Sequence, residues 1–132
     1  MVVQYNTLDD LAVAAPGPKP FKISRDRVTV EEAPVKLLSA TSPLLTTPNK
    51  ITAADFEGWV QERGLYFPSE WDPAYTTVLS TNDPGESEKP GGELYMHHGK
   101  GVFVYTAYAW WRQLAAGVPG AVRAFVNLVS AE

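Results

Sequence analysis

The sequence predicts a small α/β or α+β domain, in which a small mixed β-sheet is flanked by two helices. The chain has 132 residues, of which 45% are hydrophobic and 20% charged, and this fits one globular domain with a substantial core. Short runs of β-branched and aromatic residues alternate with turn residues, as is typical of strands. Two segments place apolar residues at the i, i+3, i+4 spacing of a helix.

The first third of the chain contains short β-prone runs separated by proline-rich connections. Residues 2–5 form the first run, and a strand this early predicts a chain that begins inside a larger fold. Residues 14–20 contain three prolines and one glycine, which disfavour helix and central strand, so we expect a surface connection there. Residues 21–30 and 35–38 are the next strand candidates, and residues 42–48 are expected to form turn and loop.

The clearest helix signal covers residues 53–63. Thr52 is a suitable N-cap, and Asp55 in the first turn is favoured by the helix dipole. Gly64 suits the left-handed residue that ends many helices. The apolar residues expected on the buried face are Phe56, Trp59 and Val60.

The second half predicts further β-structure. Residues 75–80 form a strand candidate between two turn signals, and residues 82–92 are polar and rich in Pro and Gly, so we expect an exposed loop. Residues 93–98 and 102–106 are β-prone runs on either side of Gly-Lys-Gly at residues 99–101, which predicts a hairpin.

The chain closes with a predicted amphipathic helix of about twelve residues. Pro119 stands at its start, where the missing N–H of proline costs nothing. The side chains expected to face the core are Val122, Phe125, Val126 and Val129.

Charge and composition argue against several functions. The net charge is −4 and the eleven Lys and Arg residues are scattered, which is unlike a nucleic-acid-binding surface. The absence of cysteine removes disulfides, thiolate nucleophiles and Cys-based zinc sites. No apolar run is long enough to span a bilayer, so we expect no membrane segment. No signal peptide is recognisable, and the sequence assigns the chain to no compartment.

Residues 55–67 carry the most specific pattern, Asp-Phe-Glu-Gly-Trp-Val-Gln-Glu-Arg-Gly-Leu-Tyr-Phe. Supporting segments lie at residues 3–6, 24–29, 48–52, 82–85, 99–106 and 112–121. Together they resemble the C-terminal region of large bacterial proteins of the LmbE/PIG-L deacetylase family. In that family a class I glutamine amidotransferase-like domain follows the zinc deacetylase, and the resemblance covers residues 2–130.

This resemblance implies a single domain over residues 1–132 that corresponds to the last half of a flavodoxin-like amidotransferase domain, with an inserted lobe at about residues 21–50. The chain has neither the His-Pro-Asp-Asp metal motif of the deacetylase nor the nucleophilic cysteine of the amidotransferase. No catalytic residue, metal ligand or cofactor is therefore predicted. The resemblance implies a non-catalytic accessory or interaction module, whose partner is a second copy or the remainder of a larger parent chain.

A carbohydrate-binding module is the first alternative, because exposed aromatic rings stack on sugars. Trp110 and Trp111 are adjacent and cannot both face inward on a regular element, so one of them is expected at a surface. Arg112 beside them can bind a carboxylate or form a structural ion pair. The predicted ligand-binding residues are Trp71, Trp110, Trp111 and Arg112.

A hydrolase is the second alternative. It would use His97 or His98 together with nearby acidic residues, as paired carboxylates do in glycosidases. Adjacent histidines on a strand point to opposite faces, however, and this disfavours a shared metal. The acidic residues considered are Asp55, Glu57, Glu62, Glu70 and Asp72.

Overall fold

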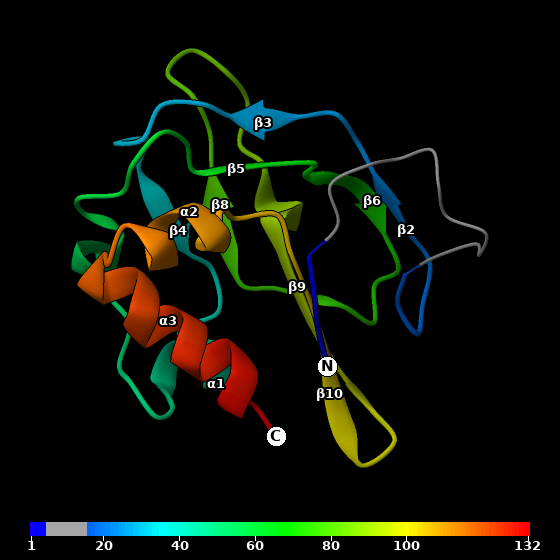
Figure 1. Cartoon of the computed structure of the whole chain (residues 1–132). Helices are drawn as coiled ribbons and strands as arrows, with labels where there is room; N and C mark the ends of the chain where they lie inside the picture. The colour runs from blue at the N-terminus through cyan, green and yellow to red at the C-terminus, as the bar shows by residue number, and fades with distance from the viewer. Residues whose placement is uncertain (5–15) are drawn as a thin grey trace.

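A computed structural model of the chain describes residues 1–4 and 16–132 (Figure 1). It has mixed strands and helices, which confirms the predicted α/β or α+β class. The helices gather on one side of the molecule, and the antiparallel pair of β2 and β6 lies on the other side. The last residue of the predicted strand at 2–5, and residues 14 and 15 of the predicted connection, lie outside the described residues.

A four-stranded mixed sheet forms the centre of the fold, in the order β1-β10-β9-β7. Its strands are β1 (Val2–Val3), β7 (Thr76–Thr77), β9 (Glu93–His98) and β10 (Gly101–Thr106). β1 runs parallel to β10, and the other pairs are antiparallel. The predicted β9–β10 hairpin is confirmed, and Gly99 in its turn has a φ of 60°, which glycine adopts without strain.

Three two-stranded pairs surround the central sheet. They are β2 (Phe21–Ile23) with β6 (Pro68–Trp71), β3 (Arg27–Val28) with β5 (Gly64–Leu65), and β4 (Val35–Leu37) with β8 (Leu79–Thr81). The predicted strand at 21–30 is thus divided into β2 and β3, and the one at 75–80 into β7 and β8. β5 and β6 were not predicted, because neither shows a two-residue apolar alternation.

The helices are α1 (Pro43–Thr46), α2 (Trp110–Ala115) and α3 (Pro119–Ser130), with short 3₁₀ helices η1 (Ala53–Phe56) and η2 (Pro90–Gly92). The prediction of turn and loop at 42–48 is wrong for α1, which Ser42 caps through its side chain. α2 was also missed. η2 ends the predicted loop at 82–92, and its two glycines are buried rather than exposed.

The predicted helix at 53–63 is wrong beyond its first turn. Thr52 and Asp55 form the expected cap, since the Thr52 N–H donates to Asp55 Oδ2 at 2.8 Å. The helix ends at Phe56, because the backbone then becomes extended and Gly58 adopts a φ of 68°. Gly64 does not end a helix but begins β5, where a Cβ would lie 2.3 Å from the carbonyl oxygen of Ala107. Glycine is needed there for close backbone approach.

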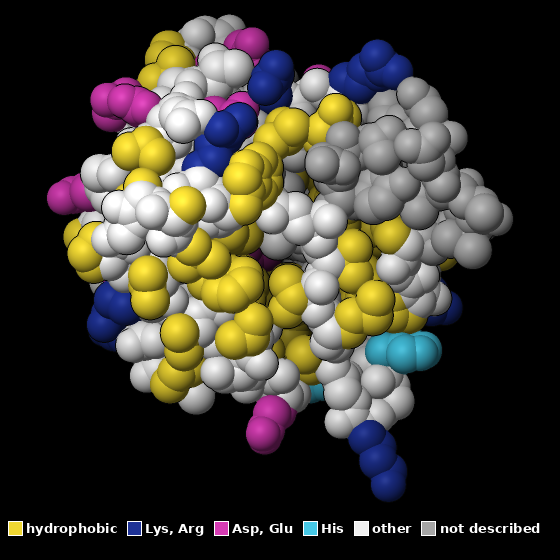
Figure 2. Space-filling model, in the orientation of Figure 1, with side chains coloured by type: hydrophobic (Ala, Val, Ile, Leu, Met, Phe, Trp, Pro, Cys, Tyr) yellow, Lys and Arg dark blue, Asp and Glu magenta, His cyan; other side chains and the backbone are white. Residues whose placement is uncertain are grey.

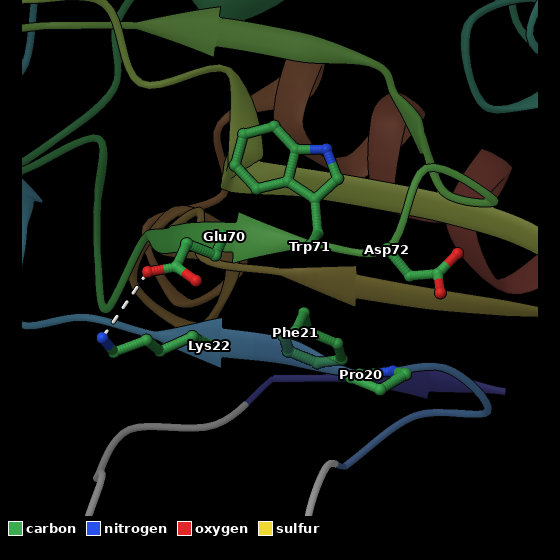
Figure 3. Close-up of a pocket in the computed structure, with 6 residues that line it drawn as sticks. All are labelled: Pro20, Phe21, Lys22, Glu70, Trp71 and Asp72. Carbon is green, nitrogen blue, oxygen red and sulfur yellow. Dashed lines mark ion pairs between the residues drawn. The ribbon is translucent and has the colours of Figure 1, made fainter.

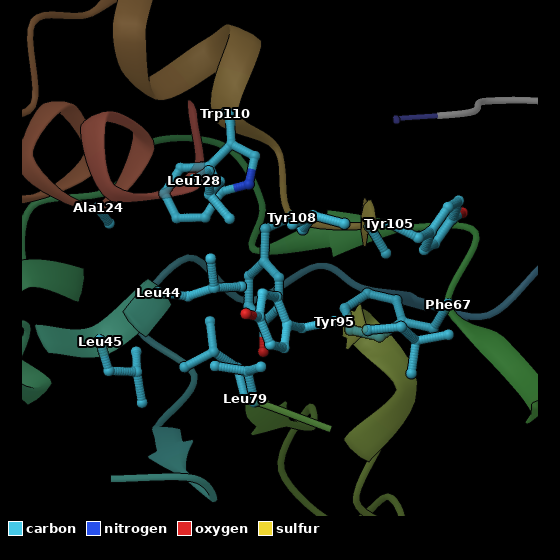
Figure 4. Packing of buried hydrophobic residues seen from close by; sticks show 14 of the residues in the cluster. Leu44, Leu45, Phe67, Leu79, Tyr95, Tyr105, Tyr108, Trp110, Ala124 and Leu128 are labelled. Carbon is cyan, nitrogen blue, oxygen red and sulfur yellow. The ribbon is translucent and has the colours of Figure 1, made fainter. Parts of the chain in front are cut away.

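Aromatic rings from several elements fill the core (Figure 4). The rings of Trp59 and Trp110 meet edge to face with centroids 5.1 Å apart, and Phe67 and Tyr108 do the same at 5.7 Å. Such contacts add to the hydrophobic stabilisation of the buried rings. Trp59 is buried as predicted, although it lies after η1 rather than on a long helix.

Candidate functional site

Helix α3 leaves three valines at the surface, on the side opposite to its buried face. Val122 is 43% exposed, Val126 37% and Val129 58%. At 100° per residue these three side chains fall within an arc of about 60°. We call this surface the α3 outer face. Hydrophobic side chains gather over this part of the molecule in Figure 2.

The predicted orientation of α3 is therefore wrong, although its extent and its start at Pro119 are right. The residues that pack inward are Ala121, Ala124, Asn127 and Leu128, while Phe125 is half-buried. Small side chains allow the helix to lie close to the core. The approach is closest at Gly120, where a Cβ would lie 2.1 Å from the carbonyl oxygen of Asp55.

Polar contacts fix this orientation. The Asn127 side chain donates to the carbonyl oxygens of Leu44 at 3.0 Å and Asn49 at 2.7 Å, and its Oδ1 accepts the Asn49 N–H at 2.9 Å. Arg123 donates from Nε to Asp55 Oδ1 at 2.8 Å. Because Asn127 is fully buried and satisfied, rotation of α3 would leave amide groups without partners.

The adjacent tryptophans of α2 have different environments. Trp110 is only 2% exposed, and its Nε1 donates to Thr106 Oγ1 at 2.8 Å. It is part of the core and presents no surface to a ligand, in contrast to the predicted exposure of a ligand-binding residue. Trp111 is 41% exposed, and the Arg112 guanidinium lies 5.7 Å from its ring centroid. Since α2 packs on α3, Trp111 lies on the helix next to the one that carries the α3 outer face.

An ion-pair network holds Arg112 in place. Its Nε donates to Glu62 Oε1 at 2.9 Å, and Arg27 donates to the other oxygen of the same carboxylate at 3.1 Å. Glu62 is buried, and two guanidinium groups compensate for its lost hydration. Of the two interpretations of Arg112 from the sequence, the structural ion pair is present.

Trp71 lies at a separate pocket of about 300 Å³ between β2 and β6 (Figure 3). Its indole is half-buried, and one edge lies against Gly91, where a Cβ would be 2.6 Å from the ring. In Figure 3 the ion pair of Lys22 and Glu70, 3.6 Å apart, lies to one side of Trp71 and Asp72 to the other. The residues that line the pocket are Pro20, Phe21, Lys22, Glu70, Trp71 and Asp72.

The predicted ligand-binding residues thus do not form one site. Trp71 belongs to β6 and the pair Trp111–Arg112 to α2, and these two elements lie on opposite sides of the molecule in Figure 1. This separation was not predictable from local patterns, because β6 pairs with β2 through contacts such as that of Phe21 with Trp71, far apart in the chain.

His97 and His98 are both exposed near the β9–β10 turn. The Nε2 atom of His97 lies 3.0 Å from the Tyr95 hydroxyl, whereas His98 borders a cavity of about 390 Å³ beside Phe103. Among the described residues, no three His, Asp or Glu side chains are placed to hold a metal ion. Of the acidic residues considered for hydrolysis, Asp55 and Glu62 are held in the ion pairs described above.

A buried acid lies in the central sheet and was not anticipated. Glu93 is fully enclosed at the start of β9, and its Oε2 has no hydrogen-bond partner. Burial raises the pKa of Glu93 to about 8, although a hydrogen bond with Thr106 opposes the shift. Burial, followed by the nearby Glu93 carboxylate, raises the pKa of Tyr108, whose hydroxyl is also unpartnered. Glu93 is therefore largely neutral at pH 7.

Comparisons of the chain with models of protein families, with curated proteins and with solved structures found no match. The resemblance to the LmbE/PIG-L family consequently stays a prediction. In the described part of the chain, no helix has both the length and the apolar character needed to cross a membrane.

Proposed function

We propose that the chain is a non-catalytic interaction module that associates with a second copy of itself through the α3 outer face. The observation that supports this most strongly is the exposure of Val122, Val126 and Val129 on a helix whose opposite face is already buried. Valine on a solvated helix face contributes less to helix stability than Ala, Lys or Glu would, so folding alone does not explain it.

The size of the patch supports a protein partner. With Trp111, the exposed parts of the three valines amount to roughly 350 Å², close to the largest apolar patch of a typical monomer, and such patches often mark interaction sites. Each partner in a stable complex buries about 800 Å², of which somewhat more than half is apolar. The patch is thus large enough to form most of the apolar centre of one interface.

Charge and spacing favour a second copy as the partner. The only charged residue of α3 is Arg123, and it is bound by Asp55, so two copies of this face meet without like-charge repulsion. Val122, Val126 and Val129 follow the 4-then-3 spacing of a helix-pair seam. In a twofold arrangement Val126 of each copy would lie near the axis, which makes the face complementary to itself.

Sedimentation equilibrium over a range of protein concentrations tests this proposal. We expect the wild-type chain to dimerise, and we expect Val126→Glu to weaken the dimer at least tenfold, because it places two carboxylates near the axis. Ser87→Glu is the matched control, since it adds the same charge in an exposed loop remote from α3. A wild-type chain that stays monomeric at every concentration would contradict the proposal.

The resemblance offers a wider setting for the same module. If the parent is an LmbE/PIG-L-type protein, this chain would act as its accessory region, and the dimer would join two parent molecules. Co-sedimentation with a separately produced upstream segment of such a parent distinguishes the cases. Binding that Val126→Glu abolishes, without wild-type self-association, would assign the α3 outer face to the parent chain instead.

Carbohydrate binding at Trp71 is a second candidate, because its half-buried indole lies in a pocket between charged groups. Aromatic rings flanked by hydrogen-bonding side chains suit sugar faces and hydroxyls. Titration with a panel of oligosaccharides should quench or shift Trp fluorescence in the wild type and not in Trp71→Ala. No response to any sugar would eliminate this candidate and leave the α3 proposal unaffected.

A further inference from the structure

Arg63 is a buried cation in the segment between η1 and β5, immediately before β5. Its side chain is 4% exposed, and its guanidinium lies 5.3 Å from the ring centroid of Trp59. Nε donates to the carbonyl oxygen of Ala33 at 2.8 Å, and Nη1 donates to that of Phe56 at 2.5 Å. Nη2 has no hydrogen-bond partner in the described part of the chain, and it is not completely shielded from solvent.

Arg63 differs from every other buried charged residue that the structure describes. Glu62 is held between two arginines, and Asp55 binds Arg123. Glu93 avoids its charge by remaining protonated at neutral pH. Among the described residues no carboxylate lies within ion-pair distance of Arg63, yet an arginine side chain keeps its proton in proteins. A buried cation without a counter-ion is costly, so this position favours an anionic group from outside the chain.

A pocket of about 290 Å³ gives access to Arg63. Its apolar walls include Pro34, Val35, Ala53 and Phe56, and its acidic residues are Glu31, Glu32 and Glu57. Glu32 and Glu57 are exposed, and among the described residues no hydrogen bond or ion pair involves their side-chain carboxylates. Burial lowers the pKa of Arg63, whereas Tyr108, Glu32 and Glu31 act in the opposite direction.

This combination of charges selects among ligands. A simple anion would meet Arg63 but would be repelled by the three carboxylates that line the pocket. A simple cation would be attracted by the carboxylates but repelled by Arg63. A molecule with a carboxylate at one end and an ammonium group nearby satisfies both, and the apolar walls suit a small aliphatic side chain.

We propose that this pocket binds a small zwitterion of the free α-amino acid class, with an apolar side chain. The ligand carboxylate accepts hydrogen bonds from the open side of the Arg63 guanidinium. Its ammonium group donates to Glu32 and Glu57, and its side chain packs between Val35 and Phe56. The site is separate from the α3 outer face, so its occupation does not depend on self-association.

Three related compounds test the proposal on the wild-type chain by ¹H–¹⁵N NMR titration. L-Valine should perturb the Arg63 Nε–H resonance. N-acetyl-L-valine lacks the ammonium group and L-valinamide lacks the carboxylate, so each should bind at least about tenfold more weakly. No binding of valine would overturn the proposal. Equal binding of N-acetylvaline would reduce the site to an anion site, and equal binding of valinamide would reduce it to a cation site, so either result would also overturn it.

Variants at the entrance keep the test independent of folding, because Arg63 also holds two backbone carbonyls. The double variant Glu32→Gln with Glu57→Gln changes only exposed side chains, and it should weaken valine binding about tenfold. Glu70→Gln is the matched control, since it removes one exposed carboxylate on β6 and should leave the affinity unchanged. Unchanged affinity in the double variant would overturn the assigned role of the acidic residues.

Discussion

The inner and outer faces of α3 differ in the size and polarity of their side chains and in how far these are buried. The inner face has small or polar side chains, Ala121, Ala124 and Asn127, which let the helix approach η1 and α1 closely. The outer face has bulkier valines that remain largely exposed. Close backbone approach and hydrogen bonding can therefore decide which face of a helix is buried, even where hydrophobicity alone favours burial of the opposite face.

We expect the largest loss of stability from a substitution on the inner face of α3. Leu128→Ala should lower the free energy of unfolding by about 2–4 kcal/mol, because Leu128 is 3% exposed and its removal leaves a cavity. Urea unfolding followed by Trp fluorescence measures this change at a protein concentration too low for self-association. A loss below about 1 kcal/mol would mean that the inner face contributes little to the packing of α3.

A rise in pH is expected to weaken the core around Glu93 in the central sheet. Glu93 lies opposite Thr106 in the sheet, and Thr106 accepts the Trp110 indole N–H. Unfolded Glu93 ionises near its ordinary pKa of 4.5, whereas the pKa of the folded group is about 8. Between these values the folded state binds a proton that the unfolded state has lost, so stability falls as the pH rises from about 5 to 8.

Glu93→Gln should remove this part of the pH dependence. We expect the variant to exceed the wild type in unfolding free energy by about 1–3 kcal/mol at pH 6, and to differ little at pH 4. Urea titrations at both pH values provide the measurement. A wild-type stability that does not decline over this range, or an equal decline in the variant, would contradict a protonated Glu93.

The smallest expected effect concerns the outer face. Val126→Ala should change the unfolding free energy of the monomer by less than about 0.5 kcal/mol, because the side chain is already partly solvated and alanine has the higher helix propensity. The same urea assay, at low protein concentration, compares it with Leu128→Ala. Similar losses in the two variants would mean that the two faces are equally buried.

Local signals in the sequence predicted the β9–β10 hairpin and the extent of α3, because turn glycines and a starting proline act within a few residues. The prediction of a helix at 53–63 was wrong beyond its first turn because it depended on Gly64, whose role is set by a long-range contact. Gly64 is required for contact with Ala107, more than forty residues away, and not for a helix end. The prediction that the valines of α3 face inward was wrong for a similar reason, since the buried Asn127 side chain donates to the carbonyl oxygens of Asn49 and Leu44.

The candidate surfaces were predicted only in part. Exposure of one residue of the pair Trp110–Trp111 followed from their adjacency, but which one is buried depends on the hydrogen bond from Trp110 to Thr106. The separation of Trp71 from Trp111 follows from strand pairing that no local pattern specifies. The buried charge of Arg63 was not foreseen, because burial of an arginine beside Glu62 depends on tertiary packing.

Disulfide trapping is a direct test of self-association through the α3 outer face, because the chain contains no cysteine and a single one can be introduced. Val126→Cys places a thiol at the centre of the α3 outer face, and Ala54→Cys places one at an exposed position of η1 as a control. Under mild oxidation at equal concentrations, we expect a covalent dimer to form much faster for Val126→Cys than for Ala54→Cys. Equal rates for the two variants would contradict an interface between copies at the α3 outer face.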